Sequence, residues 1–332
     1  MSFRVKREIF ARTMWLKDLY NKGRELTSSE YPDPRERDSL LNILLESVLH
    51  LQRYAVLTDP FQNISERDCE LFLGCARRLA EGEPVQYIVG WTEFYGRRFD
   101  VTPDVLIPRP ETEQLCRDVI ERARILFPDR PGCIMTDVPD PPEASRQCIS
   151  ELSPLRILDL CTGSGCIAWT LALELPGSCV VGVDISSAAL KVAKAQNLLP
   201  AAGNAGVCCP RHPEFVEYDV LRGPDSFDCD CGGFDVIVSN PPYVRESERL
   251  LMRRNVLEHE PSLALFVPDE NPLKFYKAVR DWARRFLVPG GLLFLEGNEA
   301  LMEETGAIFC DFSEHGTFSD CFGKPRFIFA RK

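Results

Sequence analysis

The chain has 332 residues, 45% of them hydrophobic and 27% charged, which is the composition of a folded globular protein and excludes a disordered one. This length predicts two domains. The formal net charge of -11 argues against nucleic acid as a direct partner, because much of the surface would repel a phosphate backbone.

The chain shows neither the ~20 consecutive apolar residues that cross a bilayer nor a signal peptide, so we expect no membrane partner and a cytoplasmic location. The first 20 residues are rich in Arg and Lys and leave a mitochondrial or other organellar location as the alternative. Glu8 and Asp18 interrupt this stretch and favour a solvated first helix.

Fourteen cysteines occur, mostly in apolar or helical contexts, which favours reduced thiols and a reducing compartment. One loop region carries residue types that bind zinc, namely Cys208, Cys209, His212, Cys229 and Cys231. These cysteines lack the Cys-x-x-Cys spacing that lets two thiolates reach one ion, so we expect no metal.

Residues from about 12 to 82 carry apolar residues at helical spacing, which predicts an all-helical first domain over residues 1–83. Ser65 to Asp68 resembles a capping box that begins a helix, and Gly82 is suited to end it. The proline-rich stretch YPDPRERD, residues 31–38, predicts a loop between helices.

Short β-type runs separated by turn residues follow in 84–110 and predict a hairpin linker. A helix is expected from Glu111 to about Phe127. The insertion 128–153 has many prolines and little apolar periodicity, so it predicts a surface insertion or flexible loop.

After Pro154, continuous apolar strands alternate with helical stretches. The strands are expected at 156–160, 179–183, 236–238 and 292–295. This alternation is typical of a parallel sheet covered by helices on both faces, so residues 111–332 are expected to form a doubly wound α/β domain.

A glycine-containing turn connects the first of these strands to a helix through Cys161, Thr162, Gly163, Ser164 and Gly165. Glycine can take a positive φ and lets a ligand approach the backbone closely. The same spacing, Gly163-x-Gly165-x-x-Ala168, also satisfies the dinucleotide fingerprint, so a nicotinamide or flavin cofactor, or an ordinary tight turn, stays open on this motif.

Two carboxylates follow at positions suited to a nucleoside. Asp184 comes 19 residues after Gly165, just after a strand, where it can bind ribose hydroxyls. Asp219 lies further along and can accept from an adenine amino group, with a plain surface acid as the alternative.

The segment Asn240-Pro241-Pro242-Tyr243 directly follows an apolar strand, at the sheet edge where catalytic groups of parallel sheets gather. A planar nitrogen attacks a sulfonium methyl poorly unless acceptors hold its N–H groups. The side-chain oxygen of Asn240 and the carbonyl of Pro241 are suited to that task, and Tyr243 can stack on a flat substrate. This predicts methylation of a planar nitrogen, with a proline-rich turn as the alternative.

Together these motifs resemble the HemK/PrmC family of peptide chain release factor glutamine methyltransferases. The resemblance rests on GEPVQYIVGWTEFYG, VLIPRPET, LDLCTGSGCIA, VVGVDIS, VSNPPYV, EHEPSLALF, PGGLLFLE and FSDCFGKPRF. It implies a class I methyltransferase fold with a seven-stranded, mostly parallel sheet, a small helical N-terminal domain and a β-hairpin linker.

The resemblance also implies S-adenosyl-L-methionine as cofactor and, as substrate, the N5 amide nitrogen of the glutamine in the Gly-Gly-Gln motif of a class-1 release factor. It implies that the helical domain contacts the release factor, and that Asn240, Pro241, Pro242 and Tyr243 bind the glutamine. The implied cofactor-binding residues are Cys161, Thr162, Gly163, Ser164, Gly165, Asp184, Asp219, Val220 and Asn240.

Several departures from the family pattern stand out, and the proline-rich insertion and the Cys208 and Cys209 region are additions to it. Cys161 replaces a usual glycine, and VPDENPLKF replaces a glycine-rich acidic turn after ALF. An adenine-N6 or guanine-N2 methyltransferase of DNA or RNA is the first alternative, disfavoured by the acidic charge. A non-catalytic module that only binds S-adenosylmethionine is the second, disfavoured by the intact Asn240 and Asp184. We expect a monomer.

Overall fold

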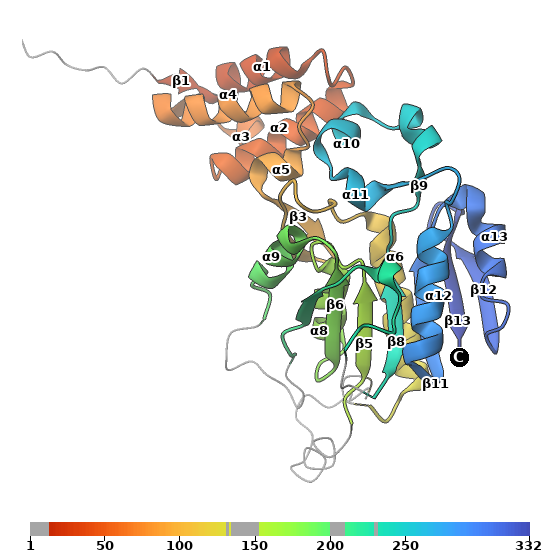
Figure 1. The fold of residues 1–332 in the computed structure, drawn as a ribbon. Helices are drawn as coiled ribbons and strands as arrows, with labels where there is room; N and C mark the ends of the chain where they lie inside the picture. Colours follow the sequence, from red (N-terminus) through yellow and green to blue (C-terminus); the bar gives the residue numbers. More distant parts are fainter. Residues whose placement is uncertain (1–12, 131–132, 134–152, 200–209, 229–231) are drawn as a thin grey trace, which may run out of the picture. The chain divides into compact units, whose positions relative to one another are not determined.

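The computed structural model describes residues 13–130, 133, 153–199, 210–228 and 232–332, which divide into two compact units (Figure 1). The first unit contains the residues up to Gly90 together with Arg253–His259, and the second contains Trp91–Met252 and Glu260–Lys332. The domain boundaries expected from the sequence, 1–83, 84–110 and 111–332, stay a prediction, as do the roles of these three parts.

Several sequence expectations lie outside the described residues. These are the Arg- and Lys-rich residues 1–12, nearly all of the insertion 128–153, and Cys208, Cys209, Cys229 and Cys231 of the candidate zinc loop. Within the described residues, no group of three or more His, Cys, Asp or Glu side chains is arranged to hold a metal ion. None of the helices described there is long and apolar enough to cross a bilayer.

The first unit is mainly helical, as expected, and a two-residue antiparallel pair of strands adds to the helices. Its elements are β1 (Met14–Trp15), α1 (Leu16–Thr27), α2 (Pro34–Val48), α3 (Ala55–Thr58), β2 (Asn63–Ile64), α4 (Glu66–Ala80), α5 (Val85–Val89) and α10 (Arg254–His259). Its core is formed by the buried faces of α1, α2 and α4, where Leu16, Leu45 and Phe72 are fully buried.

The helix starts in this unit show where local sequence signals succeeded and failed. Helix α4 begins at Glu66, as predicted, and the Ser65 side chain accepts from the Asp68 backbone N–H at 3.2 Å. The predicted loop over residues 31–38 is wrong from Pro34 onward, because α2 begins there. The Asp33 side chain accepts from the Arg35 N–H, and a proline at the first helical position loses no hydrogen bond.

A seven-stranded sheet forms the centre of the second unit. Its strands are β5 (Arg156–Leu160), β6 (Cys179–Asp184), β7 (Glu214–Glu217), β8 (Phe234–Ser239), β11 (Leu287–Glu296), β12 (Glu314–Ser319) and β13 (Pro325–Arg331), in the order β12-β13-β11-β8-β5-β6-β7. The strands from β11 to β7 pair in parallel, whereas β13 pairs antiparallel with both β11 and β12. The expected seven-stranded, mostly parallel sheet is confirmed, and β12 and β13 form an antiparallel hairpin at its edge.

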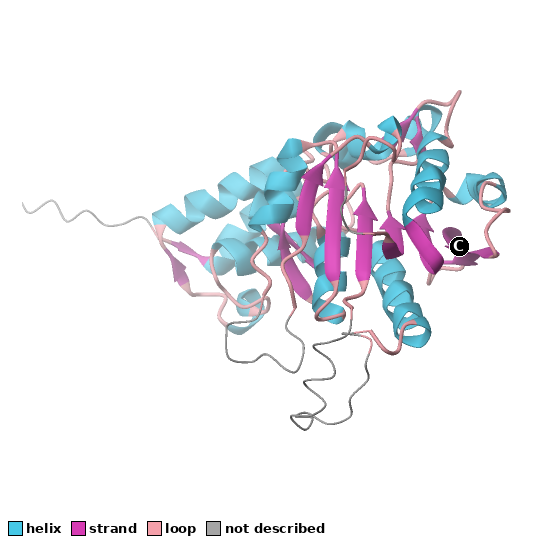
Figure 2. Ribbon diagram, turned by 60° about the horizontal axis from the view of Figure 1, so that its bottom comes forward, coloured by secondary structure: helices cyan, strands magenta, loops and turns pink. Residues whose placement is uncertain are grey.

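Helices cover both faces of this sheet (Figure 2). One face is covered by α6 (Pro110–Leu126), α8 (Cys166–Glu174) and α9 (Ser187–Ala195), and the other by α12 (Lys274–Phe286) and α13 (Met302–Ala307). The remaining elements of the unit are α11 (Ser262–Leu265), the 3-10 helices η1 (Val220–Arg222), η2 (Glu246–Leu251) and η3 (Glu299–Leu301), and the short parallel pair β9 (Val244–Arg245) and β10 (Phe266–Val267). Neighbouring strand residues face opposite sides: Ile157 packs with α6 and α8, and Leu158 packs with α12.

The expected hairpin is formed by β3 (Trp91–Phe94) and β4 (Arg97–Asp100), which pair antiparallel. Its two turn residues, Tyr95 and Gly96, have φ of 51° and 68°, as in the tight turns that suit the twist of a hairpin. The side chain of Gln196 accepts from the Asp100 N–H and donates to the Asp100 carbonyl, so it fixes the end of β4 against the second unit's α/β core.

Candidate active site

The carboxyl ends of the parallel strands border a cavity of about 220 Å³ within the second unit. Residues that directly follow β5, end β6, and follow β7 and β8 all reach its wall. Of the sequence-predicted site residues, those lining it are Cys161, Thr162, Gly163, Ser164, Asp184, Asp219, Val220, Asn240 and Pro242. The fold therefore collects side chains from four separate sequence segments at one edge of the sheet.

The two glycines of the glycine loop, residues 161–165, are required for different structural reasons. Both lie at positive φ, 54° for Gly163 and 78° for Gly165. A Cβ added to Gly163 would meet nothing within 4 Å, whereas one added to Gly165 would lie 3.0 Å from the side chain of Ala193 and 3.1 Å from those of Phe215 and Trp169. Gly163 thus leaves open space at the cavity, and Gly165 lies behind the wall, where the loop packs on its own domain.

Cys161 adopts a backbone conformation that glycine normally occupies, with φ of 62°. This conformation costs a residue with a side chain about 1–2 kcal/mol, which accounts for the glycine usual in the family at this position. Burial raises the pKa of the Cys161 thiol well above its ordinary value, so the thiol stays protonated at the cavity wall.

Asp184 holds the glycine loop and still faces the cavity. One of its carboxylate oxygens accepts from the Gly163 N–H at 2.8 Å and the other from the Ser186 N–H at 2.9 Å. Burial raises the pKa of Asp184, and these two backbone donors oppose that rise. Each carboxylate oxygen can accept a second bond, so capacity remains for ligand hydroxyls.

Asp219 precedes η1, and one of its oxygens accepts from the Leu221 N–H at 2.9 Å. The adjacent Val220 is buried, and its carbonyl accepts from the indole N–H of Trp282 at 3.0 Å. Both residues reach the cavity. A carboxylate beside an apolar side chain is an arrangement suited to a base with an exocyclic amino group.

The tetrad, Asn240-Pro241-Pro242-Tyr243, begins where β8 ends, beside β5. The Ser239 hydroxyl donates to the Leu160 carbonyl at 2.6 Å, so the last residues of these two strands are tied together. Asn240 and Pro242 line the cavity. Pro241 is buried, and neither Pro241 nor Tyr243 lines the cavity. The roles expected for the Pro241 carbonyl and the Tyr243 ring stay predictions.

Thr112 and Glu296, two buried residues that were not predicted from the sequence, hold the tetrad by hydrogen bonds. The Asn240 side-chain N–H donates to the Thr112 hydroxyl at 3.1 Å, and that hydroxyl donates to Glu296 at 2.8 Å. The Tyr243 hydroxyl donates to the other oxygen of Glu296 at 3.0 Å. Thr112 lies in the IPRPET motif, residues 107–112, and Glu296 is the last residue of a parallel strand. These two sequence positions are the features that could have identified them as site residues.

A second unassigned pair links the IPRPET motif to the segment before α11. Arg109 donates to Glu260 at 2.5 Å, and the Ile107 N–H donates to the other Glu260 oxygen at 3.2 Å. The Glu260 side chain is 1% exposed, so these two donors replace water as its hydrogen-bond partners. Arg109 and Pro261 both line the cavity, and the ion pair holds these two parts of the wall together.

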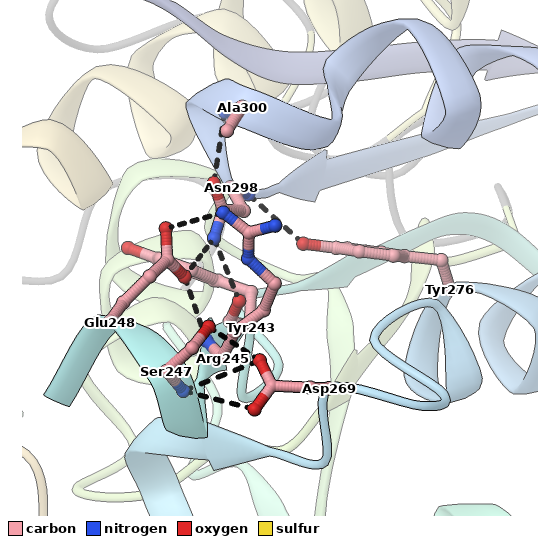
Figure 3. Close-up of polar contacts among 8 residues, drawn as sticks. All are labelled: Tyr243, Arg245, Ser247, Glu248, Asp269, Tyr276, Asn298 and Ala300. Atoms are coloured by element: carbon pink, nitrogen blue, oxygen red, sulfur yellow. Dashed lines mark hydrogen bonds and ion pairs between the residues drawn. The ribbon is translucent and has the colours of Figure 1, made fainter.

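The segment after the tetrad is anchored by Asn298, which follows β11 (Figure 3). The Asn298 amide donates to the Tyr243 carbonyl at 3.1 Å and to the Glu248 carboxylate at 2.8 Å. Glu248 also accepts from the Arg245 N–H at 2.8 Å, and Asp269 accepts from Ser247. The chain that leaves the tetrad is thereby held in place by the end of the neighbouring strand.

Two family models match the chain. The PrmC N-terminal domain matches residues 18–90, and the methyltransferase small domain matches residues 140–261. A release factor glutamine methyltransferase from Flavobacterium psychrophilum is 35% identical over 301 residues, which cover 89% of this chain and 92% of that protein. One from Bacteroides thetaiotaomicron is 39% identical and covers 77% of this chain and 78% of that protein.

The solved structures that match are more distant in sequence than these relatives. A protein-(glutamine-N5) methyltransferase (release factor-specific) from Alicyclobacillus acidocaldarius has 23% sequence identity and a TM-score of 0.36, covering 70% of this chain and 99% of that chain. Family membership rests on the sequence relatives.

Proposed function

The chain belongs to the PrmC family of release factor glutamine methyltransferases, and from this premise we propose that the cavity at the carboxyl ends of β5, β6 and β8 is its active site. The reaction is transfer of a methyl group from S-adenosyl-L-methionine to the side-chain amide of a release factor glutamine, at N5 in the Gly-Gly-Gln motif. The observation that carries the site is the position of Asn240 on the same wall as the glycine loop.

The residues on the wall fit the cofactor. Gly163 leaves open space beside the cavity, Asp184 keeps acceptor capacity for ribose hydroxyls, and Asp219 with Val220 suits the adenine. We assign cofactor binding to Cys161, Thr162, Gly163, Ser164, Gly165, Asp184, Asp219, Val220 and Asn240, with Gly165 acting through the packing of the loop. When bound, the cofactor supplies an electrophilic methyl group on a sulfonium.

The protein's contribution to the chemistry is to hold the amide nitrogen of the substrate. The Asn240 side-chain oxygen and the Pro241 carbonyl accept its two N–H groups, which favours the pyramidal nitrogen of the transition state over the planar ground state. Pro242 and Tyr243 bind the flat amide group. No general base is required, because the proton leaves after the nitrogen has become cationic.

The wider assignments follow from the same family. The helical N-terminal unit contacts a class-1 release factor away from the reacting glutamine, and nucleic acid and membranes are not direct partners. The protein acts as a monomer in the cytoplasm, with an organellar compartment as the alternative.

One labelling experiment tests the function. Purified protein is incubated with methyl-labelled S-adenosylmethionine and a release factor, and in parallel with the same factor whose Gly-Gly-Gln glutamine is replaced by alanine. Label is expected only in the first reaction, on one glutamine identified by mass spectrometry. Equal labelling of both factors contradicts the assignment, and salt-sensitive labelling of DNA or RNA supports the nucleobase alternative instead.

A further inference from the structure

Asn240, Thr112 and Glu296 form a hydrogen-bonded chain across three elements that are distant in sequence. They come from the end of β8, the first turn of α6 and the last position of β11. The distances are 3.1 Å from Asn240 Nδ2 to Thr112 Oγ1 and 2.8 Å from Thr112 Oγ1 to Glu296 Oε2. Thr112 is 2% exposed and Glu296 1%, so the protein itself must satisfy these groups.

The number of protons fixes the direction of this chain. A threonine hydroxyl has one proton and can donate only once, and an ionised carboxylate can only accept. The Thr112 proton therefore goes to Glu296, and Thr112 must accept from Asn240. Asn240 accordingly turns its NH2 group toward Thr112, which leaves its oxygen at the other end of the planar amide.

The charge of Glu296 matters for this direction. Burial raises the pKa of Glu296, while the hydroxyls of Thr112 and Tyr243 and the charge of Arg326 favour the carboxylate. A protonated Glu296 would donate to Thr112 and free the Thr112 proton for Asn240. The amide of Asn240 would then be able to take the opposite orientation.

We propose that Glu296, acting through Thr112, is a positioning residue for methyl transfer, because it holds the Asn240 amide with its oxygen toward the cavity. The inference rests on the proposed role of Asn240 as an acceptor. In the opposite orientation the NH2 group of Asn240 would face the NH2 group of the substrate, and two donors cannot bind one another. Thr112 lines the cavity and Glu296 does not, so Glu296 acts only through its neighbours.

Three substitutions test the positioning role. Thr112→Val keeps the shape but removes the hydroxyl, Thr112→Ser restores the hydroxyl, and Glu296→Gln removes the charge. Thr112→Val and Glu296→Gln are expected to lower kcat by ~10- to 100-fold, a loss near the lower range for removing one preorganised polar contact to the transition state. Cofactor affinity should stay within about threefold, and Thr112→Ser should recover most of the lost kcat.

A matched control separates positioning from packing. Thr305 is also fully buried, and its hydroxyl donates to the carbonyl of Leu301, the residue just before its own helix α13. Thr305→Val therefore removes a buried threonine hydroxyl elsewhere in the same unit and should leave kcat unchanged. Thermal unfolding of each variant identifies loss of the fold, and if Glu296→Gln does not fold, Thr112→Val decides.

A double-mutant cycle gives the readout that a merely structural role would not change. In the Asn240→Ala background, Thr112→Val should lower the residual turnover by less than about twofold, because the amide that it orients is absent. Fully additive losses, or an unchanged kcat for Thr112→Val, overturn the inference. If wild-type protein does not label the glutamine, or Asn240→Ala keeps full turnover, the proposed function or its site has failed instead.

Discussion

Two buried carboxylates, Asp159 beside the glycine loop and Glu296 beside the tetrad, differ in their hydrogen-bond partners. Asp159 lies under the glycine loop, and one of its oxygens accepts from the Thr162 hydroxyl at 2.6 Å and the Ala168 N–H at 3.2 Å. Its other oxygen finds no hydrogen-bond partner among the residues that the structure describes. Glu296 lies under the tetrad and has a donor on each oxygen.

The origin of the donors also differs. Those of Asp159 come from three and nine residues along the chain, whereas those of Glu296 come from 184 and 53 residues away. The carboxylate on the side that we propose for the cofactor is thus held by local contacts, and the one on the side that we propose for the substrate by long-range contacts. A substitution on either side should affect a different measured quantity.

The largest effect is expected for Asn240→Ala, which removes the acceptor that we propose for the substrate amide and leaves the glycine loop intact. Turnover should fall by ~1000-fold, because the lost interaction is needed mainly in the transition state. Cofactor affinity, measured by calorimetry, should change by less than about tenfold. A large loss of cofactor affinity with normal turnover would contradict this assignment and would place Asn240 with the cofactor-binding residues alone.

A smaller effect is expected when the glycine loop is changed. Gly165→Ala should lower the free energy of unfolding by ~3 kcal/mol, because a left-handed φ is combined with contacts of 3.0–3.1 Å. Gly163→Ala has the φ cost without the contacts, so we expect ~1 kcal/mol together with weaker cofactor binding. Urea unfolding compares the two, and equal losses would contradict the packing role of Gly165.

An effect smaller than that of Gly165→Ala concerns the charge of Asp159 and depends on pH. Burial raises the pKa of Asp159 to about 7, above its value in the unfolded chain, so the folded state binds the extra proton. The stability associated with this group is therefore fully present below pH ~4 and is lost as the pH rises through about 7.

Asp159→Asn should consequently stabilise the cofactor-free protein by ~2 kcal/mol at pH 8 and by much less at pH 5. Urea unfolding at both pH values measures this difference. Asp228→Asn, at an exposed position, is the control and should show no such pH dependence. A gain that is the same at both pH values, or a loss at pH 8, contradicts the account.

Local patterns predicted much of this architecture. Strands β5, β6, β8 and β11, the glycine loop and the start of α4 depend on residues within a few positions of one another, so they can be predicted from the sequence. The same local reasoning failed at Pro34, where a proline-rich stretch was interpreted as a loop although proline suits the first position of a helix.

The sequence by itself determined the fold class, the glycine loop and the position of the tetrad after a parallel strand. Only the tertiary structure decided what holds the tetrad, because Asn240 meets Thr112 across 128 residues of separation and Thr112 meets Glu296 across 184, through packing of α6 against the sheet. Residue spacing in the sequence cannot predict such a contact, because the contact forms only once the sheet has assembled.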